Sequence, residues 1–90
     1  MKKCIITVVG KDKVGIIAGV CQYLSDISVN ILNISQTIVE GYFNMMMIVD
    51  CNNASQPADK LADDLEKIGD DIGVSIKMQH EDIFNSMHRI

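Results

Sequence analysis

The sequence predicts an α+β domain in which four strands and two helices follow one another in the order βαββαβ, with a short extra helix at the C-terminus. Three observations carry this prediction. Two runs of residues are apolar on both faces, two other runs alternate apolar with polar residues, and two longer segments carry apolar residues at helical spacing. With 90 residues, the chain is long enough for one such domain and no more.

The first strand and the first helix are expected between residues 3 and 27. Residues 3–9 are rich in β-branched side chains, which predicts a strand buried on both faces. From Val14 onward the apolar residues recur at helical spacing, and Asp12 or a neighbouring loop group is expected to cap this helix. Its expected buried face consists of Val14, Ile17, Cys21 and Leu24, flanked by Ile16, Val20 and Ile27.

The middle of the chain predicts two strands joined by a tight turn at Glu40-Gly41. Residues 31–39 alternate, which favours an edge strand with one face toward solvent. Residues 42–51, YFNMMMIVDC, favour a second strand that is apolar on both faces. In the alternating strand, one expected face holds Leu32, Ile34 and Ile38, and the other holds Asn33, Ser35 and Thr37.

The last part of the chain predicts a second helix, a final strand and a tail. Pro57 is expected in the first turn of the helix, where its missing N–H group costs little, and Gly73 is a plausible stop. The following strand alternates and is expected to be wet on one side. The expected apolar positions are Ala58, Leu61, Ala62, Leu65, Ile68 and Ile72 in the helix, Val74, Ile76 and Met78 in the strand, and Ile83, Phe84, Met87 and Ile90 in the tail.

This order of elements indicates a ferredoxin-like sandwich: a four-stranded antiparallel sheet with two helices on one face. Right-handed crossovers place the first and third strands in the middle and the second and fourth at the edges, as the hydrophobic patterns also require. We expect one domain over residues 1–80 and a helical tail over residues 81–90. The uncovered sheet face would expose apolar side chains, which predicts self-association by stacked sheets or by paired edge strands, unless the tail covers that face.

The charge and the cysteines limit the range of partners. The net charge is −4 and Arg89 is the only arginine, so a nucleic acid partner is not expected. No apolar stretch is long enough to span a bilayer, so a membrane partner is not expected either. The odd number of cysteines, Cys4, Cys21 and Cys51, argues against a disulfide framework and favours free thiols in a reducing cytoplasm.

The stretch GKDKVGIIAG, residues 10–19, is the first candidate for a ligand site. A phosphate-binding P-loop needs Lys and Ser or Thr after its second glycine, where this chain has Ile16 and Ile17. A dinucleotide fingerprint would need a third glycine. What remains is a sharp strand-to-helix turn whose N–H groups suit a carboxylate or another small anion.

Two motifs together resemble the ACT domain family: VVGKDKVGIIAGV around the first turn and SVNILNIS at the start of the second strand. The resemblance extends through Met78, and the tail EDIFNSMHRI is similar to that of small stand-alone ACT proteins related to the ACT module of the glycine cleavage system repressor. Val14 stands where the family usually has proline, and Ser28 stands where it usually has glycine. The resemblance implies a regulatory module that binds amino acids where the turn meets a partner subunit.

Carried over by position, the resemblance implies a ligand site made of the turn and of the asparagine that begins the second strand. In such a site, N–H donors would take the ligand carboxylate, while Asp12 or the Asn30 carbonyl would take its ammonium group. Two structural alternatives stay open: Gly15 only allows close packing of helix and strand, and Asn30 only ties down a turn. The implied ligand-binding residues are Gly10, Asp12, Val14, Gly15, Ile16 and Asn30.

Catalytic and metal chemistry find little support in the sequence. His80, Glu81, Asp82 and His88 match no closed metal site, and the chain has no CxxC motif. Both histidines lie far along the chain from the cysteines, so no nucleophile and base are paired. An acylphosphatase would need an arginine in the first turn, where this chain has only lysines. No cofactor and no metal are expected.

The sequence therefore predicts a non-enzymatic regulatory module, a homodimer that binds a small molecule, most plausibly an amino acid. The alternative is an adaptor that uses the same fold without a ligand and binds a regulatory protein through its sheet face or its tail.

Overall fold

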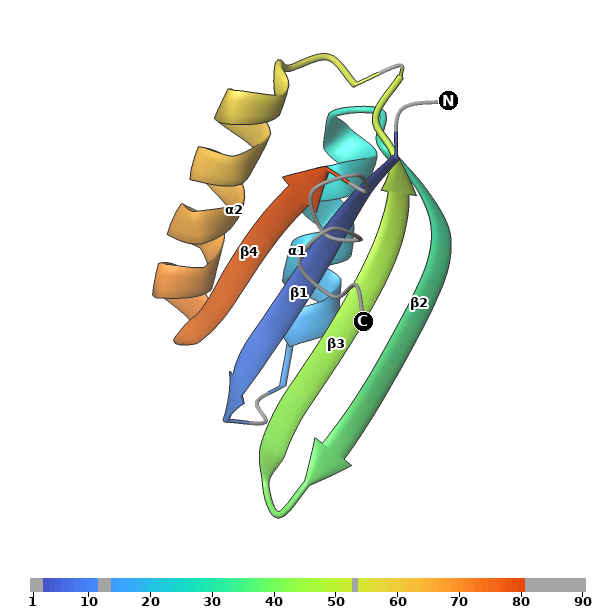
Figure 1. Cartoon of the computed structure of the whole chain (residues 1–90). Coiled ribbons are helices and arrows are strands. Elements are labelled where there is room, and N and C mark those ends of the chain that lie inside the picture. The colour runs from blue at the N-terminus through green and yellow to red at the C-terminus, as the bar shows by residue number, and fades with distance from the viewer. Residues whose placement is uncertain (1–2, 12–13, 53, 81–90) are drawn as a thin grey trace.

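The computed structural model describes residues 3–11, 14–52 and 54–80 and has the predicted βαββαβ order (Figure 1). The tail helix expected over residues 81–90, and with it the division at residue 80, lies outside the described residues. The elements are β1 (Lys3–Lys11), α1 (Ile16–Asp26), β2 (Asn30–Val39), β3 (Tyr42–Asp50), α2 (Ala58–Ile72) and β4 (Val74–His80).

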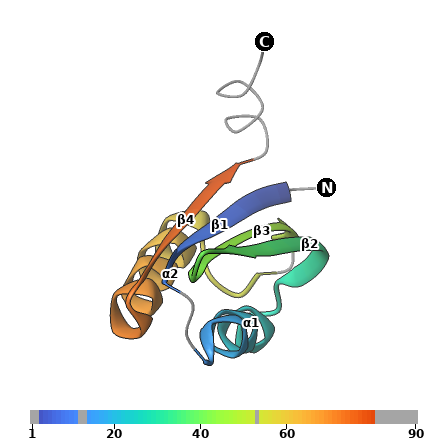
Figure 2. The same ribbon diagram turned by 90° about the horizontal axis from the view of Figure 1, so that it is seen from below.

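The four strands form one antiparallel sheet in the order β2-β3-β1-β4, so the prediction of central and edge strands is confirmed. Gly10 marks one end of the sheet, where it lies between Phe43 of β3 and Val74 of β4. Asp50 marks the other end, where it lies between Lys3 and Asn30. Both helices cover the same face of the sheet (Figure 2), as the ferredoxin-like arrangement requires.

The hydrophobic core fills the space between the sheet and the two helices. The two central strands are the main contributors, because every second residue of each points toward the helices. The opposite face, which we call the outer face, carries Ile5, which is buried apart from this core, and the more exposed Val9 and Met46. The core includes Cys4, Ile6 and Val8 of β1, Phe43, Met45, Met47 and Val49 of β3, Ile16, Val20 and Leu24 of α1, and Leu61 and Leu65 of α2.

Helix α1 begins two residues later than its apolar pattern suggests. Its N-cap is Gly15, with a φ of 92° in the left-handed region, and the first helical residue is Ile16. Val14, which we expected on the buried face, lies in the turn before the helix and is fully exposed. Asp12, the expected capping residue, lies outside the described residues. The prediction for Val14 was wrong because it lies before the helix, where the helical spacing no longer fixes its direction.

Strand β2 differs most from its prediction, because neither of its faces is buried over most of its length. A bulge between Ile31 and Asn33 takes Leu32 out of the regular alternation. Ile34 and Ile38 then lie on the same side as the core residues of β3, yet they are 43% and 58% exposed. The apolar alternation predicted a strand correctly, but neither of the two described helices covers Ile34 and Ile38.

Helix α2 and strand β4 pack closely, as their patterns predict. Pro57, which we expected in the first turn, is instead the N-cap that precedes Ala58. The helix ends before Gly73 as predicted, and the φ of 91° at Gly73 allows the chain to turn into β4. A Cβ atom on Gly69 would lie 2.6 Å from the carbonyl oxygen of Val74, so only glycine permits this approach of helix and strand. Val74 and Ile76 are consequently buried.

A polar contact joins the two helices on the surface. The Tyr23 hydroxyl donates a hydrogen bond of 2.7 Å to Oδ2 of Asp64, and Nζ of Lys60 lies 3.0 Å from Oδ1 of the same carboxylate. The hydrogen bond from Tyr23, with Lys60 second, lowers the pKa of Asp64 below its usual value. Burial, with the Asp64 contact second, raises the pKa of Tyr23. This contact thus holds α1 against α2 at neutral pH.

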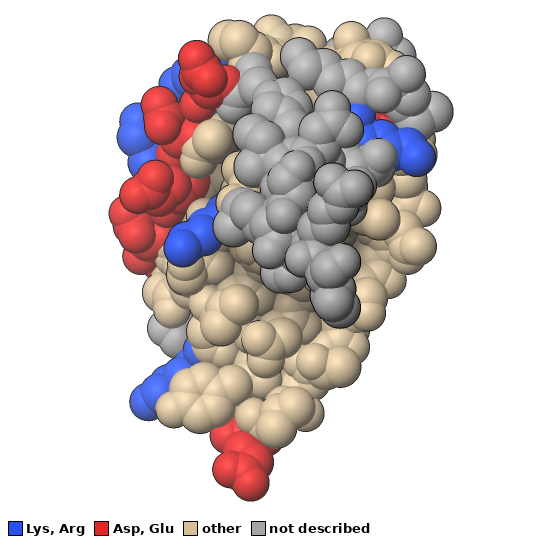
Figure 3. Space-filling model, viewed as in Figure 1, with Lys and Arg blue, Asp and Glu red and all other residues tan. Residues whose placement is uncertain are grey.

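The remaining surface of α2 is acidic. Its carboxylates gather along one side of the molecule (Figure 3), with Lys60 and Lys67 between them. In the part of the chain that the structure describes, no helix has the length and apolar character needed to cross a membrane.

Candidate functional site

Two glycines shape the turn between β1 and α1, and each does so for a different reason. At Gly10, a Cβ atom would lie 2.7 Å from Cγ1 and 3.1 Å from Cα of Val74, so glycine is required for close packing. At Gly15, a Cβ atom would meet nothing within 4 Å, but the φ of 92° is one that side chains rarely adopt. The alternative that Gly15 only allows close packing of helix and strand is therefore wrong. There is room for a side chain at this position, and it is the positive φ that requires glycine.

The turn presents main chain and not side chains at the start of α1. Ile16 is 1% exposed, so its side chain belongs to the core and only its N–H group can face a ligand. The first N–H groups of a helix have no acceptor within the helix, and they lie at the positive end of its dipole. Gly15 closes the first turn, because its carbonyl oxygen accepts the N–H of Gly19 at 2.9 Å. This end of α1 can therefore receive a carboxylate.

Asn30 lies beside a hollow of about 450 Å³ between the end of α1 and the start of β2. Ser28 has a φ of 62°, and the N–H of Val29 donates to the carbonyl of Leu24 at 2.9 Å, which folds the connection tightly. The carbonyl of Ile27 accepts hydrogen bonds from both the N–H and the Oγ of Ser55, at 2.9 and 3.4 Å. The hollow beside Asn30, which we call the Asn30 hollow, is lined by Cys21, Ser25, Ser28, Val29, Asn30 and Ile31.

The structure places the predicted turn residues close together but separates them from Asn30. Gly10, Val14, Gly15 and Ile16 lie around the turn, whereas Asn30 lies at the opposite end of the sheet, level with Lys3. The seven residue-to-residue steps from Lys3 to Gly10 span roughly 23 Å in a strand. Within one chain, therefore, the turn and Asn30 do not form one site. Asp12 lies outside the described residues.

The sequence interpretation missed five of the six residues that line the Asn30 hollow, among them Cys21 and Ser25 of α1. Cys21 was assigned to the buried face of α1, but it is only partly buried, and Ser25 is exposed. Their spacing of four residues places them on one side of the helix, next to the loop that leads to Asn30. That spacing is the signal that could have identified the wall of the hollow.

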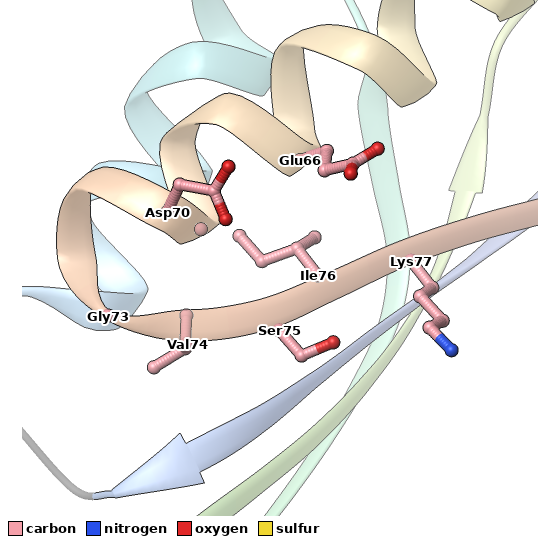
Figure 4. A pocket seen from close by; sticks show the side chains of 8 residues that line it. Glu66, Asp70, Gly73, Val74, Ser75, Ile76 and Lys77 are labelled. Atoms are coloured by element: carbon pink, nitrogen blue, oxygen red, sulfur yellow. The ribbon is translucent and has the colours of Figure 1, made fainter.

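A second hollow of about 460 Å³ lies between the C-terminal half of α2 and strand β4. Figure 4 shows Glu66 and Asp70 on the helix above Ile76, whereas Lys77 points to the other side of the strand. This hollow contains none of the residues predicted to bind a ligand. Among the described segments, no three His, Cys, Asp or Glu residues are placed to hold a metal ion. Glu81, Asp82 and His88 of the weighed metal cluster lie outside them, as does the side chain of His80.

Comparison with known proteins agrees with the observed fold and identifies a protein family whose sequence model matches this chain. The family model described as ACT domain matches residues 2–79. A UPF0237 protein of Bifidobacterium longum is 62% identical over 90 residues, which is 100% of both chains. In the structure of an ACT domain protein from Streptococcus pneumoniae, 93% of that chain aligns with 92% of this one, with 42% identity and a TM-score of 0.81.

A third comparison extends the likeness of fold. The crystal structure of a putative glycine cleavage system transcriptional repressor aligns with 88% of this chain, with a TM-score of 0.74. The match covers 45% of that chain at 20% identity, so it concerns the fold alone.

Proposed function

The chain belongs to the ACT domain family of regulatory modules, and on that premise we propose that it is a homodimer that binds an amino acid between its two subunits. In this proposal, the turn of one subunit and the Asn30 hollow of its partner form the site together. The observation that carries the proposal is that the turn and the Asn30 hollow lie at opposite ends of the sheet within one chain. A second copy is the simplest molecule that joins them.

The edge of β2 supports the proposed mode of assembly. Among the strands that the structure describes, β2 is an edge strand with no partner on its outward side, and the N–H and C=O groups of such an edge readily pair with another chain. Ile34 and Ile38 are exposed along it, as an interface between two copies would require. We therefore propose edge-to-edge pairing of two β2 strands, and not stacking of the outer faces.

A two-fold axis through the middle of β2 accounts for a site between subunits. Antiparallel pairing of the two strands about Ser35 places the Asn30 end of one beside the Val39 end of the other. The Val39 end is also the end of the sheet where Gly10 lies and α1 begins. The symmetry thus brings each turn toward the partner's hollow and creates two equivalent sites.

The chemistry of the assembled site suits an α-amino acid. The N–H groups at the start of α1 would bind the ligand carboxylate. The side-chain carbonyl of Asn30 would accept a hydrogen bond from the ligand ammonium. The side chain of the ligand would then point into the Asn30 hollow. Because this ligand contacts both subunits, it binds the dimer more tightly than either monomer and stabilises the assembly, which is the regulatory output we propose.

The proposed role is non-enzymatic and cytoplasmic. The described residues that form the two halves of the site supply main-chain N–H groups, hydroxyls, an amide and one thiol, with no histidine beside the thiol to activate it. All three cysteines are thiols, which favours a reducing compartment.

A thermal-unfolding screen against each amino acid at millimolar concentration tests the proposal. A ligand at one hundred times its Kd adds about 2.7 kcal/mol of stability, which raises the midpoint of a small domain by about 10 °C or more. We expect a shift that Asn30→Ala abolishes and that Asn44→Ala retains, because Asn44 is exposed on the outer face of the sheet, whereas both halves of the site lie on the side that carries α1. If no amino acid shifts the midpoint, the proposal fails.

The outer face favours a second candidate function, that of a protein-binding adaptor. Val9, Tyr42 and Met46 are exposed there, with Val9 between the levels of the other two along the sheet. Val9 and Met46 both line a hollow of about 270 Å³. In this case, Val9→Glu would abolish binding of a regulatory protein and leave any response to amino acids unchanged. The ligand hypothesis predicts the reverse result for Asn30→Ala.

A further inference from the structure

The lining of the Asn30 hollow restricts the ligand further than the fold does. None of its six lining residues carries a formal charge at neutral pH: they are two serines, an asparagine, a cysteine, a valine and an isoleucine. We infer that the site accepts amino acids with uncharged side chains and rejects acidic and basic ones. This inference rests on the proposed function, because it assumes that the ligand's side chain enters the hollow.

A charged side chain in this hollow would lose water without gaining an opposite charge. Val29 is buried and Ile31 is partly buried, so part of the wall cannot solvate an ion. The hydroxyls of Ser25 and Ser28 and the amide of Asn30 can each form hydrogen bonds with a neutral group. An unpaired ion in partly apolar surroundings is disfavoured by roughly 100-fold or more in affinity relative to a neutral group of the same shape.

Within the subunit that forms the hollow, the charges that flank it in the chain and in the sheet do not provide a countercharge for the ligand. Asp50 lies beside Asn30 in the sheet, and its Oδ1 accepts the N–H of Asn52 at 2.9 Å. Asp26 follows Ser25 on α1, and its Oδ1 accepts a hydrogen bond of 2.8 Å from Nε2 of Gln22. Both carboxylates lie outside the lining, so they would repel an acidic side chain without enclosing a basic one. Acidic amino acids should therefore bind most weakly.

Pairs of amino acids that differ only in charge give the sharpest test. Glutamine and glutamate, asparagine and aspartate, and citrulline and arginine have matching shapes, and their Kd values are measured by calorimetry on the purified full chain, together with the uncharged amino acids found in the thermal screen. We expect every ligand that binds to be uncharged, and each neutral member of a pair to bind at least tenfold more tightly than its charged partner wherever either binds.

A variant that adds a charge to the wall makes the test specific to the hollow. Ser25→Lys places a cation beside the ligand at an exposed helix position, where it should be tolerated. We expect it to raise the affinity for acidic amino acids relative to neutral ones by at least tenfold. The matched control, Ser75→Lys on β4, should leave that ratio unchanged because Ser75 lies in another hollow.

The thiol of Cys21 reports directly on whether the hollow is occupied. Cys21 lines it and is partly accessible, whereas Cys4 and Cys51 are buried, so a thiol reagent should modify Cys21 first. A neutral amino acid that fills the hollow should slow this reaction, and a charged one should not.

The outcomes separate the inference from the proposed function. A charged amino acid that binds as tightly as its neutral partner, or protects Cys21 equally well, overturns the inference and leaves the amino-acid sensor standing. An unchanged ratio in Ser25→Lys also overturns it, because the side chain then lies elsewhere. If no amino acid of either kind binds, the proposed function itself fails.

Discussion

The two edge strands of the sheet carry the same alternating pattern but have different surroundings. Strand β4 is covered by α2, and its apolar residues Val74 and Ile76 are buried. Strand β2 carries Ile34 and Ile38 on the corresponding side, and both remain exposed. One edge of the sheet, at β4, is therefore covered by a helix, and we call it the closed edge. The other, at β2, keeps exposed apolar side chains, and we call it the open edge.

Glycines in the two helices show how this difference arises. Gly69 of α2 lets the helix approach β4, since a Cβ atom there would lie 2.6 Å from a strand carbonyl oxygen. Gly19 of α1 faces Ile72 of α2 and not a strand, with 3.0 Å between a built Cβ atom and the Ile72 Cδ1 atom. Helix α1 thus packs toward its sister helix. The comparison shows that the burial of an edge strand depends on which element the neighbouring helix packs against. The sequence of the strand itself does not specify this.

The largest expected effect comes from truncating a side chain under the closed edge. Leu65→Ala on α2 removes a fully buried side chain and should cost about 2–5 kcal/mol of unfolding free energy, because it leaves a cavity. Ile38→Ala on β2 should cost less than about 1 kcal/mol. Urea denaturation at low protein concentration measures both. Equal losses would contradict the contrast between the two edges.

Charges on the open edge should break the dimer. Ile34→Glu together with Ile38→Glu places like charges where two copies of β2 meet, and we expect the dimer Kd to rise by about 100-fold, equivalent to about 2.7 kcal/mol. Val9→Glu is the control, since Val9 is 50% exposed on the outer face. Sedimentation equilibrium distinguishes the two interfaces. If Val9→Glu dissociates the dimer and the double variant does not, the sheets stack.

The glycine comparison predicts different outcomes for the same substitution at two positions. Gly69→Ala should destabilise the protein by about 1–3 kcal/mol, because the Val74 backbone cannot move away from the new methyl group. Gly19→Ala should be nearly neutral, because the flexible end of Ile72 can shift and alanine favours the helix by about 1 kcal/mol. Thermal unfolding of both variants tests this. A stable Gly69→Ala protein would mean that α2 does not rest on β4 this closely.

The smallest expected effect concerns the contact that holds α1 toward α2. The lowered pKa of Asp64 stabilises the fold above the pKa this group has in the unfolded chain, and this stabilisation is lost as the pH falls through the lower folded value. The raised pKa of Tyr23 acts at the other end of the scale: its contribution is complete below pH 10 and declines above it. Tyr23→Phe should therefore flatten the pH dependence of stability in both ranges. An unchanged acid limb in urea titrations would show that Lys60 alone sets the pKa of Asp64.

Much of the fold could be predicted because local patterns and burial agree. The apolar runs of β1 and β3 identify central strands, and Gly73 marks the end of α2 as expected. Val14 was misplaced because helical spacing continues through the turn without specifying where the helix begins. For β2, the bulge at Leu32 and the missing cover depend on its neighbours in space, which no local pattern encodes.

The candidate site was predictable only in part. The turn could be located because Gly15 and Gly10 punctuate a change from strand to helix spacing. The family resemblance indicated Asn30, but the sequence does not give the distance between the two ends of the sheet. Cys21, in the wall of the hollow, was missed because a partly buried position of a helix looks like core in a periodic pattern. Ser25, in the same wall, was missed because it is exposed and looks like any other solvent-facing position.

The two hydrogen bonds from Ser55 to Ile27 give the Asn30 hollow a readout elsewhere in the chain. The loop that forms the hollow is tied through this carbonyl to the segment that starts α2, 28 residues later. A molecule that stiffens the hollow should slow the opening of these two hydrogen bonds. The hydrogen-exchange rate of the Ser55 amide therefore reports whether the hollow is occupied. This rate would record events at one helix from a position at the start of the other.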